Sequence, residues 1–109
     1  MELEQITVKI DRPVGFEHHG TVYPINYGFI AGLMGGDGEE QDVYVLSNLP
    51  EYQQPISEFT GKLIAIIHRR DDVETKWVLT TADETFRAEE IMSKVHFMEQ
   101  YFDSWIELL

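Results

Sequence analysis

The chain has 109 residues, 43% of them hydrophobic and 26% charged, a composition typical of one globular domain covering residues 1–109. Its 20 acidic and 8 basic residues give a net charge of −12, which argues against nucleic acid or an anionic membrane as partner and favours divalent cations. It contains no cysteine, no apolar run of about 20 residues and no leader-like N-terminus, which predicts a cytoplasmic protein.

Five segments have the patterns of β-strands. Residues 3–10 alternate apolar and polar side chains, as a half-buried strand does, whereas the run "KLIAIIH" has no period and indicates a fully buried strand. The acidic turn "RRDDV" joins the last two strands as a hairpin. The predicted strands cover residues 3–10, 22–33, 42–46, 62–68 and 74–80.

From about Arg87 the apolar side chains follow a helical period. The stripe consists of Ile91, Val95, Met98, Phe102, Trp105 and Leu109, at spacings of 4, 3, 4, 3 and 4. This predicts one continuous amphipathic helix, whose stripe we interpret as core rather than as a cofactor site. The predicted fold is therefore mainly β with a C-terminal α-helix (α+β): a small five-stranded, OB-like antiparallel barrel packed against the helix.

Two acidic clusters stand at loops. Asp37, Glu39 and Asp42 form a D-x-E-x-x-D pattern among glycines, and carboxylate oxygens are the ligands that hard cations such as Mg²⁺ prefer. The spacing does not match an EF-hand, and taken alone it also fits a solvated acidic loop.

The second cluster lies at the predicted hairpin tip. Asp71 and Asp72 are residue types that turns favour, and Glu74 precedes Lys76 by two positions, so the two side chains face the same way. Taken alone, this cluster is a solvated turn with one surface ion pair, an interaction that contributes about 0–1 kcal/mol.

Two tyrosines bracket a Pro-Ile-Asn turn in "VYPINYGFI". The phenols of Tyr23 and Tyr27 can donate hydrogen bonds to a phosphoryl oxygen, or they form a half-buried corner between strands. His18 and His19 are adjacent, so their side chains point apart on an extended chain, and we interpret them as loop residues.

Together these segments resemble the soluble, Mg²⁺-dependent inorganic pyrophosphatases of the barrel type. "VYPINYGFI" followed by "DGEEQDVYV" is similar to the family hallmark YPxNYGxI followed by D-G-D-P-x-D-V. The segments "VKIDRP", "FTGKLIAII", "RRDDVETKW" and "VHFMEQYF" resemble, in the same order, the first strand, the G-x-x-I segment, the D-E…D-x-K cluster and the H-F-x-x-x-Y-K helix motif. The resemblance spans residues 8–102.

The resemblance implies hydrolysis of a small phosphate-containing substrate, inorganic pyrophosphate, to two phosphates. It implies Mg²⁺, or Mn²⁺, as the cofactor, and it leaves a homo-oligomer open. It assigns metal binding to Asp37, Asp42, Asp71 and Glu74, with support from Asp11 and Asp72, and phosphate binding to Tyr23, Tyr27, Lys76 and Tyr101. Glu39 stands where the family has the aspartate that accepts a proton from the attacking water.

The sequence departs from the family pattern in its basic residues. The family segment that carries a Lys-x-Glu pair and an arginine is reduced here to "VGFEHHGT", and Phe102 replaces the lysine after the helix tyrosine. Three cationic phosphate ligands are therefore missing. Asp11 replaces a glutamate, Glu74 replaces an aspartate, and D-G-D-P has become D-G-E-E.

Five residues are candidates to compensate: Arg12, His18, His19, Arg69 and Arg70. Only Arg12 and the two histidines lie where the missing residues were. We expect Tyr101 to face the site and Phe102 to face the core. Weak activity, or a shifted phosphoanhydride or phosphoester substrate, follows if nothing compensates. The alternative is a non-catalytic protein that binds a metal or a phosphate ligand on the same fold.

Overall fold

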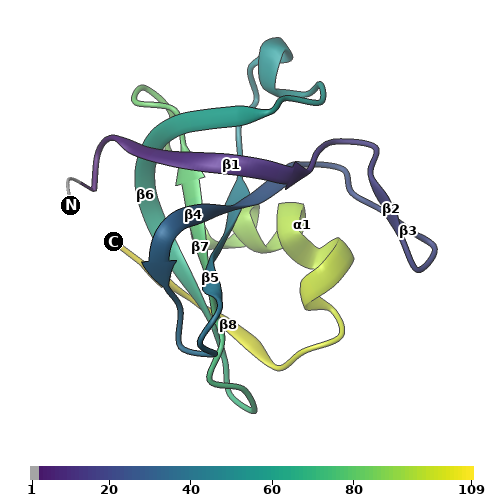
Figure 1. The fold of residues 1–109 in the computed structure, drawn as a ribbon, viewed down its shortest axis with the longest axis vertical. Helices are drawn as coiled ribbons and strands as arrows, with labels where there is room; N and C mark the ends of the chain where they lie inside the picture. The colour runs from purple at the N-terminus through teal and green to yellow at the C-terminus, as the bar shows by residue number, and fades with distance from the viewer. Residues whose placement is uncertain (1–2) are drawn as a thin grey trace.

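The computed structural model describes residues 3–109, and its strands follow the alternating and buried segments of the sequence (Figure 1). The longer elements are β1 (Ile6–Arg12), β4 (Asn26–Met34), β5 (Glu40–Val45), β6 (Glu58–Arg69), β7 (Thr75–Thr80), α1 (Ala88–Glu99) and β8 (Ser104–Leu108). A small separate hairpin consists of β2 (Glu17–His18) and β3 (Thr21–Val22), and a 3₁₀ turn covers Pro50–Tyr52.

Five strands close into a barrel because β1 pairs with both β4 and β6. Around the barrel the order is β1-β4-β5-β7-β6, and β8 extends the sheet beyond β6. Every barrel pair is antiparallel except β5 with β7, which is parallel. Strand direction cannot alternate around a closed ring with an odd number of strands. The predicted five-stranded barrel with a helix is thus confirmed, as a mixed rather than a wholly antiparallel barrel.

Alternation along β5 separates two apolar clusters. Val43 and Val45 belong to a cluster to which all five barrel strands contribute, which makes it the barrel interior. Tyr44 belongs to the other cluster, together with Ile91 and Val95 of α1. The helix therefore covers the outer face of the barrel at β5, and side chains two positions from Tyr44 along the strand lie on that same face.

The predicted helix is wrong beyond Glu99. Ile91 and Val95 are buried and Met98 packs against the same cluster, as expected, but α1 ends at Glu99 and Trp105 lies in β8. This strand pairs antiparallel with β6, and the Trp105 ring stacks on the His68 ring with centroids 4.3 Å apart. The edge of β6 offers unpaired backbone groups, and the segment "SWIEL" combines aromatic and β-branched residues that favour a strand.

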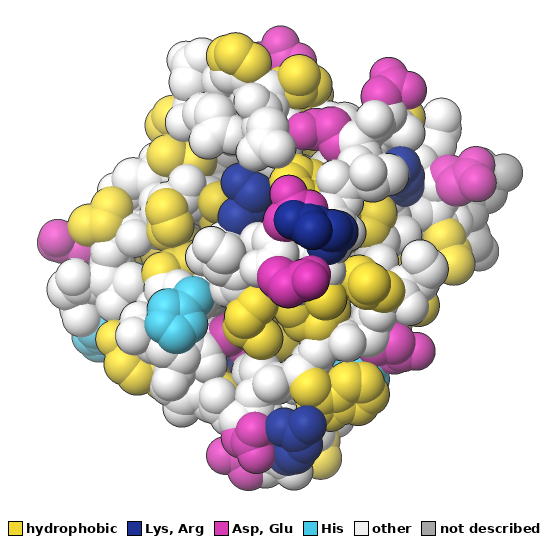
Figure 2. All heavy atoms as spheres, turned by 180° about the vertical axis from the view of Figure 1, so that it is seen from behind, with side chains coloured by type: hydrophobic (Ala, Val, Ile, Leu, Met, Phe, Trp, Pro, Cys, Tyr) yellow, Lys and Arg dark blue, Asp and Glu magenta, His cyan; other side chains and the backbone are white. Residues whose placement is uncertain are grey.

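The surface seen from behind the view of Figure 1 mixes acidic, basic and apolar side chains (Figure 2). Although acidic residues outnumber basic ones in the sequence, this face carries Lys and Arg side chains among its acidic ones. Among residues 3–109, no helix is long and apolar enough to span a membrane.

Candidate active site

The ammonium group of Lys76 is the centre of a polar cluster on the helix-covered face of the barrel. Val78 and Tyr44 belong to the helix-facing cluster, and Lys76 and Asp42 stand two positions before them on the same strands, so their side chains lie on the same face. The parallel register of β5 and β7 pairs Asp42 with Lys76. The Lys76 Nζ donates to Asp42 Oδ2 at 2.6 Å, to Tyr27 Oη at 2.8 Å and to Glu74 Oε1.

These contacts use all three N–H bonds that an ammonium group has. Lys76 is only 5% exposed, so the pattern-based prediction of a surface ion pair with Glu74 is right about the partner and wrong about the exposure. Asp42 and Glu74 thus both contact the Lys76 ammonium group, and its positive charge offsets the repulsion between the two carboxylates.

The loop that carries Asp37 and Glu39 lies against the β6–β7 hairpin. A side chain at Gly36 would place its Cβ 2.4 Å from the Val73 carbonyl oxygen, so only glycine permits this approach. The buried Gln41 side chain connects the two segments as well, by donating to the Thr75 carbonyl oxygen at 2.8 Å. The separated acidic segments of the sequence are therefore neighbours in space.

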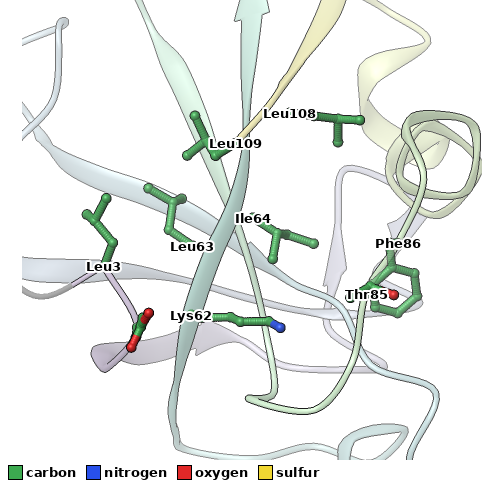
Figure 3. Close-up of a pocket in the computed structure, with 9 residues that line it drawn as sticks. Leu3, Lys62, Leu63, Ile64, Thr85, Phe86, Leu108 and Leu109 are labelled. Carbon is green, nitrogen blue, oxygen red and sulfur yellow. The ribbon is translucent and has the colours of Figure 1, made fainter.

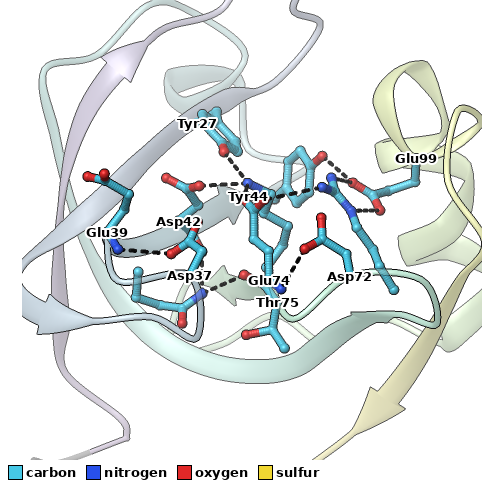
Figure 4. A network of polar contacts seen from close by, with 12 residues as sticks. Tyr27, Asp37, Glu39, Asp42, Tyr44, Asp72, Glu74, Thr75 and Glu99 are labelled. Atoms are coloured by element: carbon cyan, nitrogen blue, oxygen red, sulfur yellow. Dashed lines mark hydrogen bonds and ion pairs between the residues drawn. The ribbon is translucent and has the colours of Figure 1, made fainter.

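Figure 4 shows how the acidic side chains lie in this network. Asp37 Oδ1 accepts a hydrogen bond from the Glu39 backbone N–H at 3.0 Å, and Asp72 Oδ1 accepts one from the Glu74 N–H at 3.1 Å. The Glu39 carboxylate lies beyond Asp42, on the side away from Glu74. Asp71 is exposed at the hairpin tip, where the structure joins it to no other side chain of residues 3–109.

Asp11 occupies a bulge of β1, between Ile10 and Arg12. Burial raises the pKa of Asp11, a backbone hydrogen bond and the charge of Arg12 oppose this, and the Asp42 charge adds to it. The Asp42 charge thus acts on Asp11, to which the resemblance gives a supporting role.

The carboxylates have the chemistry of a hard-cation site without its geometry. Asp42 and Glu74 offer oxygen donors that share one cation, and Asp37 retains a free carboxylate oxygen on the adjoining loop. Within residues 3–109, no three acidic or histidine side chains are already arranged around a common point. The donor set therefore fits Mg²⁺ or Mn²⁺ chemically, with side-chain movement needed to gather it.

The two tyrosines of the Pro-Ile-Asn turn are buried beside this cluster. Tyr23 is 1% exposed and accepts a hydrogen bond from Arg12 at 2.6 Å, whereas Tyr27 accepts one from Lys76. Burial, reinforced by the Asp42 charge, raises the pKa of Tyr27 far above its ordinary value. Its phenol therefore stays protonated, and interaction with the Asp42 side chain contributes to this.

A second buried ion pair adjoins the cluster, and we did not predict it from the sequence. Arg69 donates from Nε and Nη2 to the two carboxylate oxygens of Glu99, at 3.1 and 2.7 Å. Glu99 also accepts from Tyr44 Oη at 2.7 Å and from Ser104 Oγ at 2.6 Å. The remaining Arg69 nitrogen, Nη1, lies 3.6 Å from Glu74 Oε2 and so connects this pair to the acidic cluster.

A signal for this pair is present in the sequence. Ile91, Val95 and Glu99 stand at successive spacings of four on one face of α1, and Arg69 continues the helix-facing alternation of Ala65 and Ile67 on β6. A charged residue that continues an apolar face on each of two packed elements indicates a buried ion pair.

A separate hollow lies outside this cluster. It is a groove of about 400 Å³ near the two chain ends, lined mainly by apolar side chains such as Leu63, Phe86 and Leu109 (Figure 3). Its one cation, Lys62, donates to the Ala82 carbonyl oxygen. None of the predicted site residues lines this groove.

Comparison with known proteins decides the family. The family model described as "Inorganic pyrophosphatase" matches residues 2–107. The chain belongs to the inorganic pyrophosphatase family. It is 47% identical over 69 residues to an inorganic pyrophosphatase of Aeropyrum pernix, and 33% identical over 84 residues to one of Sulfolobus acidocaldarius. These matches cover 63% and 75% of the chain but only 36% and 46% of the relatives, so the chain spans less than half of their length.

Solved pyrophosphatase structures share the fold. The inorganic pyrophosphatase of Ehrlichia chaffeensis superposes with a TM-score of 0.69 at 21% identity, covering 96% of this chain and 86% of that one. The enzyme of Coxiella burnetii gives a TM-score of 0.68 at 19% identity, covering 99% and 85%. The predicted pyrophosphatase resemblance and the OB-like barrel are thereby confirmed.

One residue of the pyrophosphatase helix motif, Phe102, is not where the helical pattern predicted it. Tyr101 is 67% exposed, and its hydroxyl has no hydrogen-bond partner among the described residues, so it is not joined to the cluster. Phe102 is 36% exposed rather than in the core. Both follow the end of α1, and the Phe102 ring lies over the Arg69 guanidinium, 3.6 Å from Cζ to the ring centroid.

Phe102→Lys, which restores the lysine of the family motif, is expected to lower the melting temperature without raising turnover. The new ammonium would replace a ring that stabilises Arg69 through a cation–π contact, and it would repel the guanidinium. Thermal unfolding and phosphate release measure the two effects, with Phe102→Met as the neutral control. Faster phosphate release by a stable Phe102→Lys protein would contradict this expectation.

Proposed function

We propose that this chain hydrolyses inorganic pyrophosphate to two phosphates in the presence of Mg²⁺ or Mn²⁺. The observation that carries the proposal is the cluster of half-buried Asp42 and Glu74 around the buried Lys76 and Tyr27, in a chain that belongs to the inorganic pyrophosphatase family. The cluster combines carboxylates for a hard cation with a protonated phenol and an ammonium group for phosphoryl oxygens.

Asp37, Asp42, Asp71 and Glu74 would hold the metal, supported by Asp11 and Asp72. A bound divalent cation neutralises phosphoryl charge and lowers the pKa of a bound water. The protein itself would bring these carboxylates together. The close approach of Gly36 to Val73 and the hydrogen bond from Gln41 to Thr75 support this role, because they hold the two acidic segments side by side.

Glu39 would accept the proton from the water that attacks one phosphorus atom. The bond between that phosphorus and the bridging oxygen breaks, and its electron pair stays on the leaving phosphate. Glu39 suits this role because it is exposed and follows Asp37 by two positions, on the loop that faces the hairpin. A general base of this kind contributes about 10²- to 10⁴-fold to the rate.

Tyr27 and Lys76 would bind phosphoryl oxygens, with Tyr23 holding the adjoining Arg12. Tyr27 would donate its proton to a phosphoryl oxygen while its own oxygen accepts from Lys76. Lys76 has no free N–H while it holds its three partners, so it binds substrate only by releasing one of them. This makes substrate binding dependent on what else holds Asp42 and Glu74.

The test is phosphate release from pyrophosphate by the purified protein with Mg²⁺ and then with Mn²⁺. We expect release by the parent protein and at least a hundredfold slower release by Glu39→Gln. The control variant Glu58→Gln, an exposed acid at the start of β6, should match the parent. Binding of metal without any release, or equal rates for Glu39→Gln and the parent, would favour the non-catalytic alternative or a different base.

A further inference from the structure

The guanidinium of Arg12 is the strongest unassigned feature beside the cluster. It is half-buried, it donates to Tyr23 Oη at 2.6 Å, and its Cζ lies 5.6 Å from the ring centroids of both Tyr23 and Tyr27. It also lies 5.9 Å from the Phe16 ring. Three aromatic rings thus surround this cation.

The bulge in β1 puts Arg12 at this position. The register pairs Ile10 with Gly28 and Arg12 with Tyr27, so Asp11 is the extra residue. Gly28 permits the close approach of the two strands, since a Cβ there would lie 1.9 Å from the Lys9 carbonyl oxygen. Without the bulge, Asp11 rather than Arg12 would face Tyr27 across the strand pair.

Arg12 and Lys76 both lie close to the Tyr27 ring but differ in their partners. Lys76 Nζ lies 5.4 Å from the Tyr27 ring centroid and contacts two carboxylates. Among residues 3–109, no carboxylate lies within 4 Å of the Arg12 guanidinium, so its charge is not neutralised by a direct ion pair. A half-buried guanidinium that lies among three aromatic rings and has no direct acidic partner is suited to an anion.

We propose that Arg12 binds a phosphoryl group of the substrate and takes the place of the basic residues that this chain lacks. This inference rests on the proposed function for the identity of the substrate. One of the five N–H bonds of the guanidinium holds Tyr23, which fixes its orientation, and the others remain for phosphoryl oxygens. The aromatic surroundings exclude water on one side and so strengthen the interaction with an anion.

The experiment measures binding rather than turnover. Isothermal titration calorimetry with methylenediphosphonate, an analogue of pyrophosphate that cannot be hydrolysed at its bridge, is performed in excess Mg²⁺. Arg12→Gln and Arg12→Met each remove the charge, and Arg12→Met also keeps apolar contact with the rings. We expect both to bind the analogue about 10- to 100-fold more weakly than the parent, the usual effect of losing a hydrogen bond to a charged group.

Arg87→Gln is the matched control because it removes the same charge from a side chain that is 77% exposed at the start of α1. It should bind the analogue as the parent does. Parental affinity in either folded Arg12 variant overturns the inference, as does an equal loss in Arg87→Gln or a parent that does not bind the analogue. Weaker binding confined to the Arg12 variants, in a parent that releases no phosphate, would support the inference while refuting the proposed hydrolysis.

Discussion

Replacing Glu99 with leucine is expected to lower the free energy of unfolding by about 3–5 kcal/mol, the usual cost of removing one partner of a buried ion pair. The Arg69 side chain is 4% exposed and Glu99 is fully buried, so the guanidinium would lose both of its hydrogen bonds to Glu99 without gaining water, and only Glu74, 3.6 Å away, would remain. Tyr44 and Ser104 would lose their acceptor as well. Urea unfolding, monitored by tryptophan fluorescence, measures the loss.

Two comparisons separate the unpaired charge from the loss of packing. The double variant Arg69→Met, Glu99→Leu removes both charges and should recover most of the stability, because apolar replacements of a buried pair are often neutral or stabilising. The exposed pair of Arg70 and Asp103 has the same chemistry, with side chains 57% and 63% exposed, and Asp103→Leu should cost at most about 1 kcal/mol. If Glu99→Leu lowers the free energy of unfolding by no more than Asp103→Leu does, the expected cost of an unpaired buried charge is wrong.

The pair also predicts a pH dependence. Burial alone would raise the pKa of Glu99, but the hydrogen bonds from Arg69, Ser104 and Tyr44 outweigh it and hold the pKa below the ordinary 4.5. The ionised carboxylate therefore stabilises the fold above pH 4.5, and this contribution is lost as the pH falls through the lowered pKa. Below pH 4.5 the parent should thus lose more stability than the double variant.

Sequence periodicity predicted the barrel strands correctly because each alternates or is wholly apolar, and it failed where two periods overlap. The positions Phe102, Trp105 and Leu109 fit a helix, yet the same short segment fits a strand at the free edge of β6. The local sequence pattern cannot decide between helix and strand here, because the strand is stabilised by hydrogen bonds to β6, which lies more than 30 residues earlier in the chain. The parallel pairing of β5 with β7 likewise depends on closure of the ring.

The acidic clusters of the site were predictable as candidates, because carboxylates at two loops resemble a family pattern. Their partners were not predictable in the same way. The burial of Lys76 follows from the parallel register that places it beside Asp42, and the position of Arg12 follows from a bulge that no local pattern indicates. Arg69 and Glu99 each continue an apolar face, one on β6 and the other on α1, but predicting that they pair requires knowing that these two elements pack together.

Mg²⁺ or Mn²⁺ is expected to raise the melting temperature of the parent protein, whereas the double variant Asp37→Asn, Asp42→Asn should show no rise. A ligand at a hundredfold excess over its Kd stabilises the folded state by about 2.7 kcal/mol. For a domain of this size, that corresponds to roughly 10–20 °C. Thermal unfolding at several metal concentrations, with NaCl adjusted to constant ionic strength, measures the shift without the contribution of charge screening.

The metal-free proteins provide the internal check. Asp42 forms an ion pair with Lys76 at 2.6 Å, so Asp42→Asn should lower the melting temperature without metal. Asp37 contacts no cation among residues 3–109, so it should tolerate Asn. The variant Glu51→Gln, Glu58→Gln removes two exposed acids elsewhere and should keep the full metal response. If that control loses the response, the cations act on overall charge rather than on a site. If the parent shows no response at millimolar metal, Lys76 holds Asp42 and Glu74 too firmly for a cation to share them.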